Sequence, residues 1–204
     1  MNFKVRPVGM AGMKILESRY FHDDRGYFLE TWSRDSFAAL DLNVSFVQDN
    51  QSLSRRRGTL RGLHFQKPPF AQGKLVRVLS GAIFDVAVDI RHGSKTAGQW
   101  FGIELTAEAG CQLFIPRGFA HGFVTLVDDT VVCYKADASY NAGSDSGIRW
   151  NDPDLAIDWR IPEISMTISD KDRALPFLRH VVESTSRSFT SHSTRGDTAN
   201  NQTS

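Results

Sequence analysis

The fold class is decided by residues 82–90, AIFDVAVDI. The large apolar side chains of this stretch fall on one face of an extended chain: Phe84, Val86, Val88 and Ile90. The opposite face receives Asp85, Ala87 and Asp89. A two-residue period of this kind is typical of a β-strand.

Further runs rich in β-forming residues surround this strand: residues 74–79, 100–105, 111–115, 120–126 and 130–136. Turn-forming pairs and triplets separate the runs, as at Ser80-Gly81 and Pro116-Arg117-Gly118. Short strands at regular spacing predict a sandwich or a barrel. Helical pattern is confined to residues 34–40, with Ser33 as a candidate N-cap, and to a short turn that opens at Ser169.

The length of 204 residues is ample for one domain and short for two. We therefore predict a single domain over residues 1–180. Residues 181–204 are rich in Ser, Thr and Asn, contain one aromatic residue (Phe189) and show no periodicity. Such a segment buries too little apolar surface to offset its ordering entropy, so we predict a flexible tail.

Charge and composition exclude several classes of protein. Lys and Arg number 24 and Asp and Glu number 23, which gives a net charge of +1 and predicts no binding to nucleic acid or to an anionic membrane. Residues 1–7 lack the apolar core of a signal peptide, and no stretch approaches the ~18 apolar residues of a membrane span. The cytoplasm is the predicted compartment. Cys111 and Cys133 lie in apolar runs and are predicted to be buried, without a disulfide.

Two of the six histidines stand in unusual surroundings. His64 lies in residues 58–66 (GTLRGLHFQ) and His121 in residues 115–123 (IPRGFAHGF), each among apolar residues and close to an arginine and glycines. Each could be a hydrogen-bonded core histidine or a functional group. The other four lie in turns or in the tail and are predicted to be surface residues: His22, His92, His180 and His192.

A metal site is not supported by the residues near these histidines. A mononuclear site in a barrel needs clustered ligands, such as a His-x-His pair with a nearby carboxylate. The position two residues after His64 is Gln66, a poor ligand, and no Glu follows closely. We predict that the protein binds no metal.

Acid–base chemistry is the alternative for His64. A neutral histidine is a good base near neutral pH, particularly when a carboxylate holds its tautomer. Asp172, in residues 169–172 (SDKD), is the candidate carboxylate, but Ser169 and Asp172 also match a helix capping box. Tyr134 shares a strand face with Val132 and Ala136, where a tyrosine is usually core filler. The residue types alone leave both choices open.

Seven segments in one order carry a resemblance to a known family. They are residues 24–30 (DRGYFLE), 46–52 (FVQDNQS), 60–66 (LRGLHFQ), 72–76 (QGKLV), 115–123 (IPRGFAHGF), Tyr134-Lys135 with Tyr140, and 169–172 (SDKD). Together they resemble the dTDP-4-dehydrorhamnose 3,5-epimerases over about residues 5–178. The resemblance implies an all-β, cupin-type jelly-roll barrel with a few short helices, a homodimer, and neither a metal nor an organic cofactor. It also implies a dTDP-linked 4-keto-6-deoxy sugar as substrate.

The resemblance implies a role for each matching residue. His64 resembles the general base, Asp172 the carboxylate paired with it, and Tyr134 the acid on the opposite sugar face. Lys74 and Arg61 resemble groups around the C4 oxygen and the neighbouring pocket. Tyr140 resembles the aromatic residue that stacks on thymine. The remaining substrate contacts of the family fall on Gln48, Asn50, His121, Lys171 and Asp145. At the position of Asp145, the family more usually has Glu. Arg25 and Glu30 resemble nucleotide contacts that partly reach across a dimer.

The implied chemistry suits these residue types. Inverting a carbon next to a ketone needs a base on one face of the ring and an acid on the other. A preorganised cation stabilises the enolate oxygen, and the ketone itself is the electron sink. Three alternatives remain: an epimerase that inverts only C3 or C5, a sugar-nucleotide ketoisomerase on the same barrel, and a non-catalytic cupin. The last would have no use for His64, Asp172 and Tyr134 together.

Overall fold

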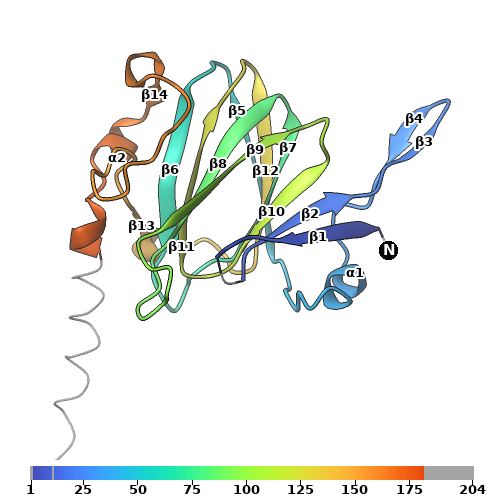
Figure 1. The fold of residues 1–204 in the computed structure, drawn as a ribbon, viewed down its shortest axis with the longest axis horizontal. Helices are drawn as coiled ribbons and strands as arrows, with labels where there is room; N and C mark the ends of the chain where they lie inside the picture. The colour runs from blue at the N-terminus through green and yellow to red at the C-terminus, as the bar shows by residue number, and fades with distance from the viewer. Residues whose placement is uncertain (1, 11, 182–204) are drawn as a thin grey trace, which may run out of the picture.

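Two six-stranded, mainly antiparallel sheets face each other in this computed structural model, which describes residues 2–10 and 12–181 (Figure 1). The first sheet has the order β1 (Phe3–Pro7), β2 (Lys14–Ser18), β10 (Cys111–Ile115), β7 (Lys74–Ser80), β12 (Thr130–Ala136) and β5 (Gln48–Ser54). The second has the order β13 (Asp145–Gly147), β6 (Thr59–Gln66), β11 (Phe119–Thr125), β8 (Ala82–Asp89) and β9 (Trp100–Thr106), with β14 (Thr167–Ile168) parallel to β6. The fold is the predicted cupin-type jelly roll.

The predicted faces of β8 are confirmed, and both are buried. Phe84, Val86 and Val88 belong to a core cluster outside the second sheet, where the C-terminal segment supplies Trp150, Trp159 and other apolar residues. The opposite face looks into the lumen between the sheets, where Ile83 and Ala87 pack with Val76, Val78 and Val132 of the first sheet. Because the C-terminal segment covers the outer face of the second sheet, β8 is buried on both faces.

A third cluster covers part of the outer face of the first sheet. Leu16, Leu75 and Phe114 pack there against Phe37 of the short helix α1 (Arg34–Ala38). The side chain of Ser33 accepts a hydrogen bond from Ser36 N at 3.1 Å, which confirms the predicted N-cap. The second predicted helical turn is α2 (Asp170–Arg173). Two short 3-10 turns, η1 (Ala142–Ser144) and η2 (Glu163–Ser165), are also present, and residues 178–181 are helical.

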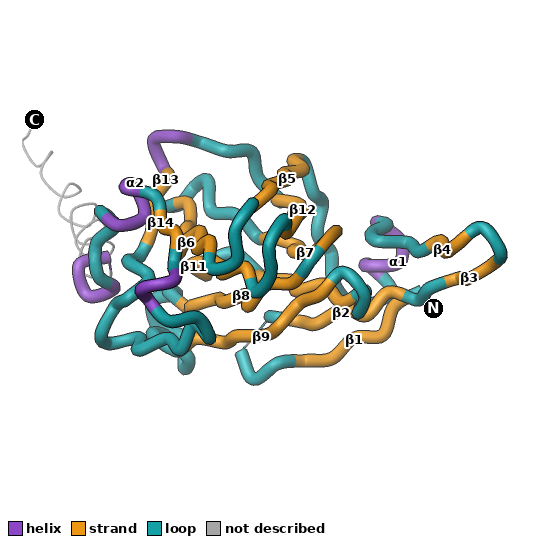
Figure 2. The backbone as a smooth tube through the Cα atoms, turned by 90° about the horizontal axis from the view of Figure 1, so that it is seen from above, coloured by secondary structure: helices purple, strands orange, loops and turns teal. Residues whose placement is uncertain are grey.

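A hairpin projects from the sandwich, at the end opposite α2 (Figures 1 and 2). Its strands, β3 (Phe21–Asp23) and β4 (Gly26–Phe28), pair only with each other in the described chain, and all six residues are exposed. None of the helices formed by residues 2–10 and 12–181 is long and apolar enough to span a membrane.

Some sequence expectations need correction. Cys111 and Cys133 are free thiols, as predicted, but both are only half-buried. Cys133 is flanked on β12 by the lumen-facing Val132 and Tyr134, so the alternation of the strand turns it outward. Of the predicted tail, Val181 is buried in the outer core cluster, and the rest, with His192, lies outside the described residues. His22, His92 and His180 are exposed, as predicted.

Candidate active site

One end of the lumen is a polar pocket of about 330 Å³. Seven of the predicted site residues line it: Arg61, His64, Lys74, His121, Tyr134, Lys171 and Asp172. Ser52, Phe123 and Ser169 complete the lining. The other end of the lumen is filled by apolar side chains such as Val78, Leu113 and Val132. The pocket is therefore an opening between the two sheets with an apolar core beneath it.

Two glycines bring the strands of His64 and His121 together. The two histidines are register partners on β6 and β11. Gly62 has φ +135°, and a Cβ there would lie 2.5 Å from the Cα of Gly122. A Cβ on Gly122 would in turn lie 2.7 Å from the carbonyl oxygen of Arg61. Gly62, two residues before His64, and Gly122, directly after His121, thus allow a close backbone approach that larger residues would block.

His64 is held by a carboxylate from the far end of the chain. Its Nε2 lies 2.8 Å from Oδ1 of Asp172, and Gly62 N donates to the other carboxylate oxygen at 3.1 Å. Burial acts to raise the pKa of Asp172, but the hydrogen bond and charge of His64 outweigh it, so the pKa is lowered. An ionised Asp172 accepts Nε2–H, which leaves Nδ1 of His64 with a free lone pair.

The helix cap and the histidine contact coexist at Asp172. Ser169 Oγ accepts a hydrogen bond from the backbone N of Asp172 at 3.1 Å, so the predicted cap is present. The side chain of Asp172 is meanwhile directed at His64. The backbone of Asp172 serves the cap and its carboxylate serves the pocket, so the two readings of this motif are compatible.

Tyr134 and Lys74 reach the pocket from the other sheet. Tyr134 lies on β12 and Lys74 at the start of β7, whereas His64 lies on β6 of the second sheet. The Lys74 ammonium lies 5.7 Å from the centre of the Tyr134 ring and donates to the carbonyl oxygen of His64 at 3.4 Å. Burial raises the pKa of the Tyr134 hydroxyl against the opposing charge of Arg61, so this phenol keeps its proton near neutral pH. A proton donor and a candidate base therefore face each other across the pocket.

A second group of predicted residues is joined by hydrogen bonds around Tyr140. Gln48 Nε2 donates to Asn50 Oδ1 at 2.8 Å, and Gln48 Oε1 accepts from Tyr140 N at 2.8 Å. Asp145 accepts from Lys171 Nζ at 2.6 Å and from the Tyr140 hydroxyl at 3.4 Å. The Tyr140 ring remains 57% exposed. This group offers an open aromatic face, and Lys171 connects it to the pocket.

Arg25 and Glu30 lie apart from both groups within the chain. Arg25 is at the turn of the projecting hairpin and forms an exposed ion pair with Asp23. Glu30 follows the hairpin and accepts from Ser36 Oγ at 2.6 Å. Neither residue lines the pocket of its own chain.

Sequence reasoning missed three residues at or beneath the pocket: Ser52, Phe123 and Asp85. Ser52 lines the pocket from β5, and its buried Oγ has no hydrogen-bond partner among the described residues. Asp85, on β8, is fully buried and lies 2.7 Å from Nε2 of His121. A usable signal was present, because Asp85 interrupts an otherwise apolar strand on the face opposite its large side chains.

The arrangement defines a class of enzyme. A histidine with a free Nδ1 stands on one sheet, a protonated tyrosine on the other, and a buried ammonium lies near both. Such a site suits proton transfer to and from the two faces of a carbon next to a carbonyl group. Within the described residues, His, Cys, Asp and Glu form no cluster of three or more that could hold a metal ion.

Comparison with known proteins specifies the family. The family model of dTDP-4-dehydrorhamnose 3,5-epimerase matches residues 7–180. The enzyme of that name from Sinorhizobium fredii is 50% identical over 172 residues, which are 84% of this chain and 87% of the relative. The crystal structure of the Bacillus anthracis enzyme, with TDP and PPi bound, is 51% identical, covers 86% of this chain and 99% of its own, and superposes with a TM-score of 0.83. The crystal structure of dTDP-6-deoxy-D-glucose-3,5-epimerase from Legionella pneumophila, in complex with dTDP-4-keto-L-rhamnose, is 43% identical to this chain. It covers 87% of this chain and 93% of its own and has a TM-score of 0.82.

The chain therefore belongs to the dTDP-4-dehydrorhamnose 3,5-epimerase family, and it is an isomerase.

Proposed function

We propose that this enzyme converts dTDP-4-keto-6-deoxyglucose to dTDP-4-dehydro-L-rhamnose by inverting C3 and C5 through the residues of the polar pocket. The observation that carries the proposal is the placement of His64 and Tyr134 on opposite sheets, with the Lys74 ammonium close to both in the pocket lining. The complex of the Legionella relative with dTDP-4-keto-L-rhamnose supports the same substrate class. We also propose that the enzyme is located in the cytoplasm.

Each inversion is one deprotonation followed by one reprotonation. Nδ1 of His64 takes the proton from the carbon next to the ketone, and the electron pair moves onto the C4 oxygen. Lys74 stabilises the enolate, a kind of contact whose loss typically slows a reaction by ~100- to 1,000-fold. Tyr134 then donates its proton to the opposite face of the same carbon. Solvent removes the proton from His64 and returns one to Tyr134, which resets both residues.

In this proposal the residues around Tyr140 bind the nucleotide. The exposed Tyr140 ring stacks on thymine, and Gln48, Asn50, Asp145 and Lys171 surround it through the hydrogen bonds described above. His121 and Arg61 contact the sugar side of the pocket. Arg25 and Glu30 serve the site of a second copy of the chain.

Isotope exchange in D2O tests the proposed reaction. We expect product formed in D2O with excess EDTA to carry deuterium at both C3 and C5, as measured by mass spectrometry, because each enolate is reprotonated by a Tyr134 hydroxyl whose proton has exchanged with solvent. Label at only one of the two carbons would instead indicate a mono-epimerase. Loss of exchange in EDTA with recovery on adding a divalent ion would contradict the predicted independence from metal.

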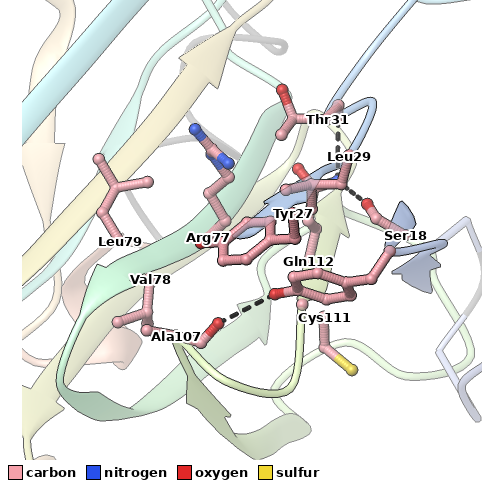
Figure 3. A pocket seen from close by; sticks show the side chains of 12 residues that line it. Ser18, Tyr27, Leu29, Thr31, Arg77, Val78, Leu79, Ala107, Cys111 and Gln112 are labelled. Carbon is pink, nitrogen blue, oxygen red and sulfur yellow. Dashed lines mark hydrogen bonds between the residues drawn. The ribbon is translucent and has the colours of Figure 1, made fainter. Parts of the chain in front are cut away.

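The projecting hairpin supports a homodimer. Tyr27 and Phe28 are 62% and 69% exposed, and an isolated two-stranded hairpin is marginally stable alone. Its base is well anchored (Figure 3): Gln112 on β10 donates to Ser18 Oγ at 3.2 Å and to Thr31 O at 2.8 Å, which ties both ends of the hairpin to the first sheet. We propose that the hairpin lies on a partner copy and carries Arg25 to the partner's pocket.

Light scattering after size exclusion tests the dimer. We expect twice the monomer mass of 22.8 kDa for the wild-type enzyme. Phe28→Glu should weaken the dimer and raise KM for the nucleotide sugar, because it places a charge where an apolar ring is covered and displaces Arg25. Ile164→Glu is a matched control, because Ile164 is 95% exposed on η2 and lies outside the hairpin. A wild-type enzyme that is monomeric at the concentration of full activity would refute the arrangement.

A further inference from the structure

Asp85 is a buried carboxylate that the proposed chemistry does not use. It lies on β8 and is 0% exposed. Its Oδ1 lies 2.7 Å from His121 Nε2, while Oδ2 is buried and has no hydrogen-bond partner among the described residues. A buried carboxylate with one free oxygen is costly unless a nearby positive charge compensates it. A positive charge close to Asp85 is therefore expected to compensate its carboxylate.

Lys74 lines the same pocket as His121, the hydrogen-bond partner of Asp85, and is 8% exposed. Burial lowers the pKa of the Lys74 ammonium to about 8, and the charges of Asp85 and Asp145 act in the opposite direction. Asp145 is shared with the Lys171 ammonium, which lies 2.6 Å away. Other titratable groups that line the same pocket are Arg61 and His64 on β6, His121 on β11, Tyr134 on β12, and Lys171 and Asp172 on α2.

We propose that Asp85 is a positioning residue for epimerisation: one oxygen orients the His121 imidazole, and its negative charge keeps the Lys74 ammonium charged in the pocket. The inference rests on the proposed function, in which Lys74 stabilises the enolate. Asp85 itself does not line the pocket, so it acts only through these two residues.

The contact between Asp85 and His121 leaves different tasks for His121 and Lys74. Burial lowers the pKa of His121 against the attraction of Asp85, so the ring is neutral near pH 7. Its Nε2–H donates to Asp85, which leaves Nδ1 as a hydrogen-bond acceptor. His121 therefore accepts a hydrogen bond from a sugar hydroxyl, and Lys74 donates to the C4 oxygen.

Asp89 provides a matched control on the same strand. It lies four residues after Asp85, on the same face of β8, and is also 0% exposed. Its oxygens accept from Arg91, Ser94 and Thr96 in the turn after β8, at 2.6 to 2.9 Å. Asp89→Asn thus removes a buried negative charge from β8 without touching the pocket.

The direct test is a titration of Lys74 by NMR with ¹³C-labelled lysine, assigned through Lys74→Arg. Asp85→Asn keeps an oxygen that can accept Nε2–H of His121 but removes the charge. We expect the midpoint of Lys74 to fall by about one pH unit in Asp85→Asn, because the variant removes a negative charge that favours the ammonium form. Asp89→Asn should leave the midpoint unchanged. An unchanged midpoint in folded Asp85→Asn, or an equal fall in both variants, would overturn the proposal.

The pH profile of deuterium exchange gives a second readout. Lys74 is charged below its pKa, so exchange is lost as the pH rises through that value, and Asp85→Asn should move this alkaline limb to lower pH. If wild-type enzyme shows no exchange, the proposed function fails while the titration still tests Asp85. Should Asp85→Asn not fold, the ¹⁵N spectrum of wild-type His121 decides: a proton on Nε2 alone supports the proposal, and a proton on Nδ1 near pH 7 overturns it.

Discussion

Replacing His64 with alanine is expected to abolish solvent exchange at both C3 and C5 while the fold survives. Removal of a positioned general base typically slows proton transfer by ~100- to 10,000-fold. The fold should tolerate the change because the His64 side chain is 32% exposed in the pocket and its contact is with a single carboxylate. The measurement is deuterium incorporation by mass spectrometry, with circular dichroism to establish folding.

Two further variants sharpen the His64 experiment. Asp172→Asn should be slower than wild type but less impaired than His64→Ala, because the imidazole remains present though poorly oriented. His92→Ala is the control, since His92 is exposed in the turn after β8 and lies outside the pocket. Substantial exchange in a well-folded His64→Ala enzyme would eliminate His64 as the base.

Replacing Tyr134 with phenylalanine is expected to separate exchange from inversion. His64 can still remove the proton and return a solvent-derived proton to the same face, so deuterium should enter the sugar. Little inverted product should form, because the donor on the opposite sheet is gone. Coupling to a downstream reductase measures the inverted product, and mass spectrometry on the same sample measures exchange.

The competing interpretation of Tyr134 is core filler on a strand. In that case the loss of one hydroxyl would cost only ~1 kcal/mol of stability and leave turnover intact. The geometry bears on this choice, because Tyr134 lines the pocket and its ring faces the Lys74 ammonium at 5.7 Å. An unchanged rate of inversion in Tyr134→Phe would favour the filler interpretation and require another acid.

Alternation and β-forming composition predicted the strands β7 to β12, but not β5 and β6, which carry site residues. Residues 82–90 carry large apolar side chains at alternate positions, so their period of two is visible in the sequence. The strand β5 (Gln48–Ser54) was not predicted, because its partly buried positions are polar: Gln48, Asn50 and Ser52. A strand that presents polar groups to a pocket loses the hydrophobic signal by which strands are recognised.

The sequence by itself determined the class of fold, the two helix caps and the resemblance that names the site residues. Only the tertiary structure decided which of them meet. His64 and Asp172 are 108 residues apart in the chain and 2.8 Å apart in space. Tyr134 shares its strand face with the buried residues Val132 and Ala136, and its role depends on which sheet lies opposite. Local propensity and periodicity specify which way a side chain points along its own element, whereas the group it faces depends on long-range packing of the two sheets.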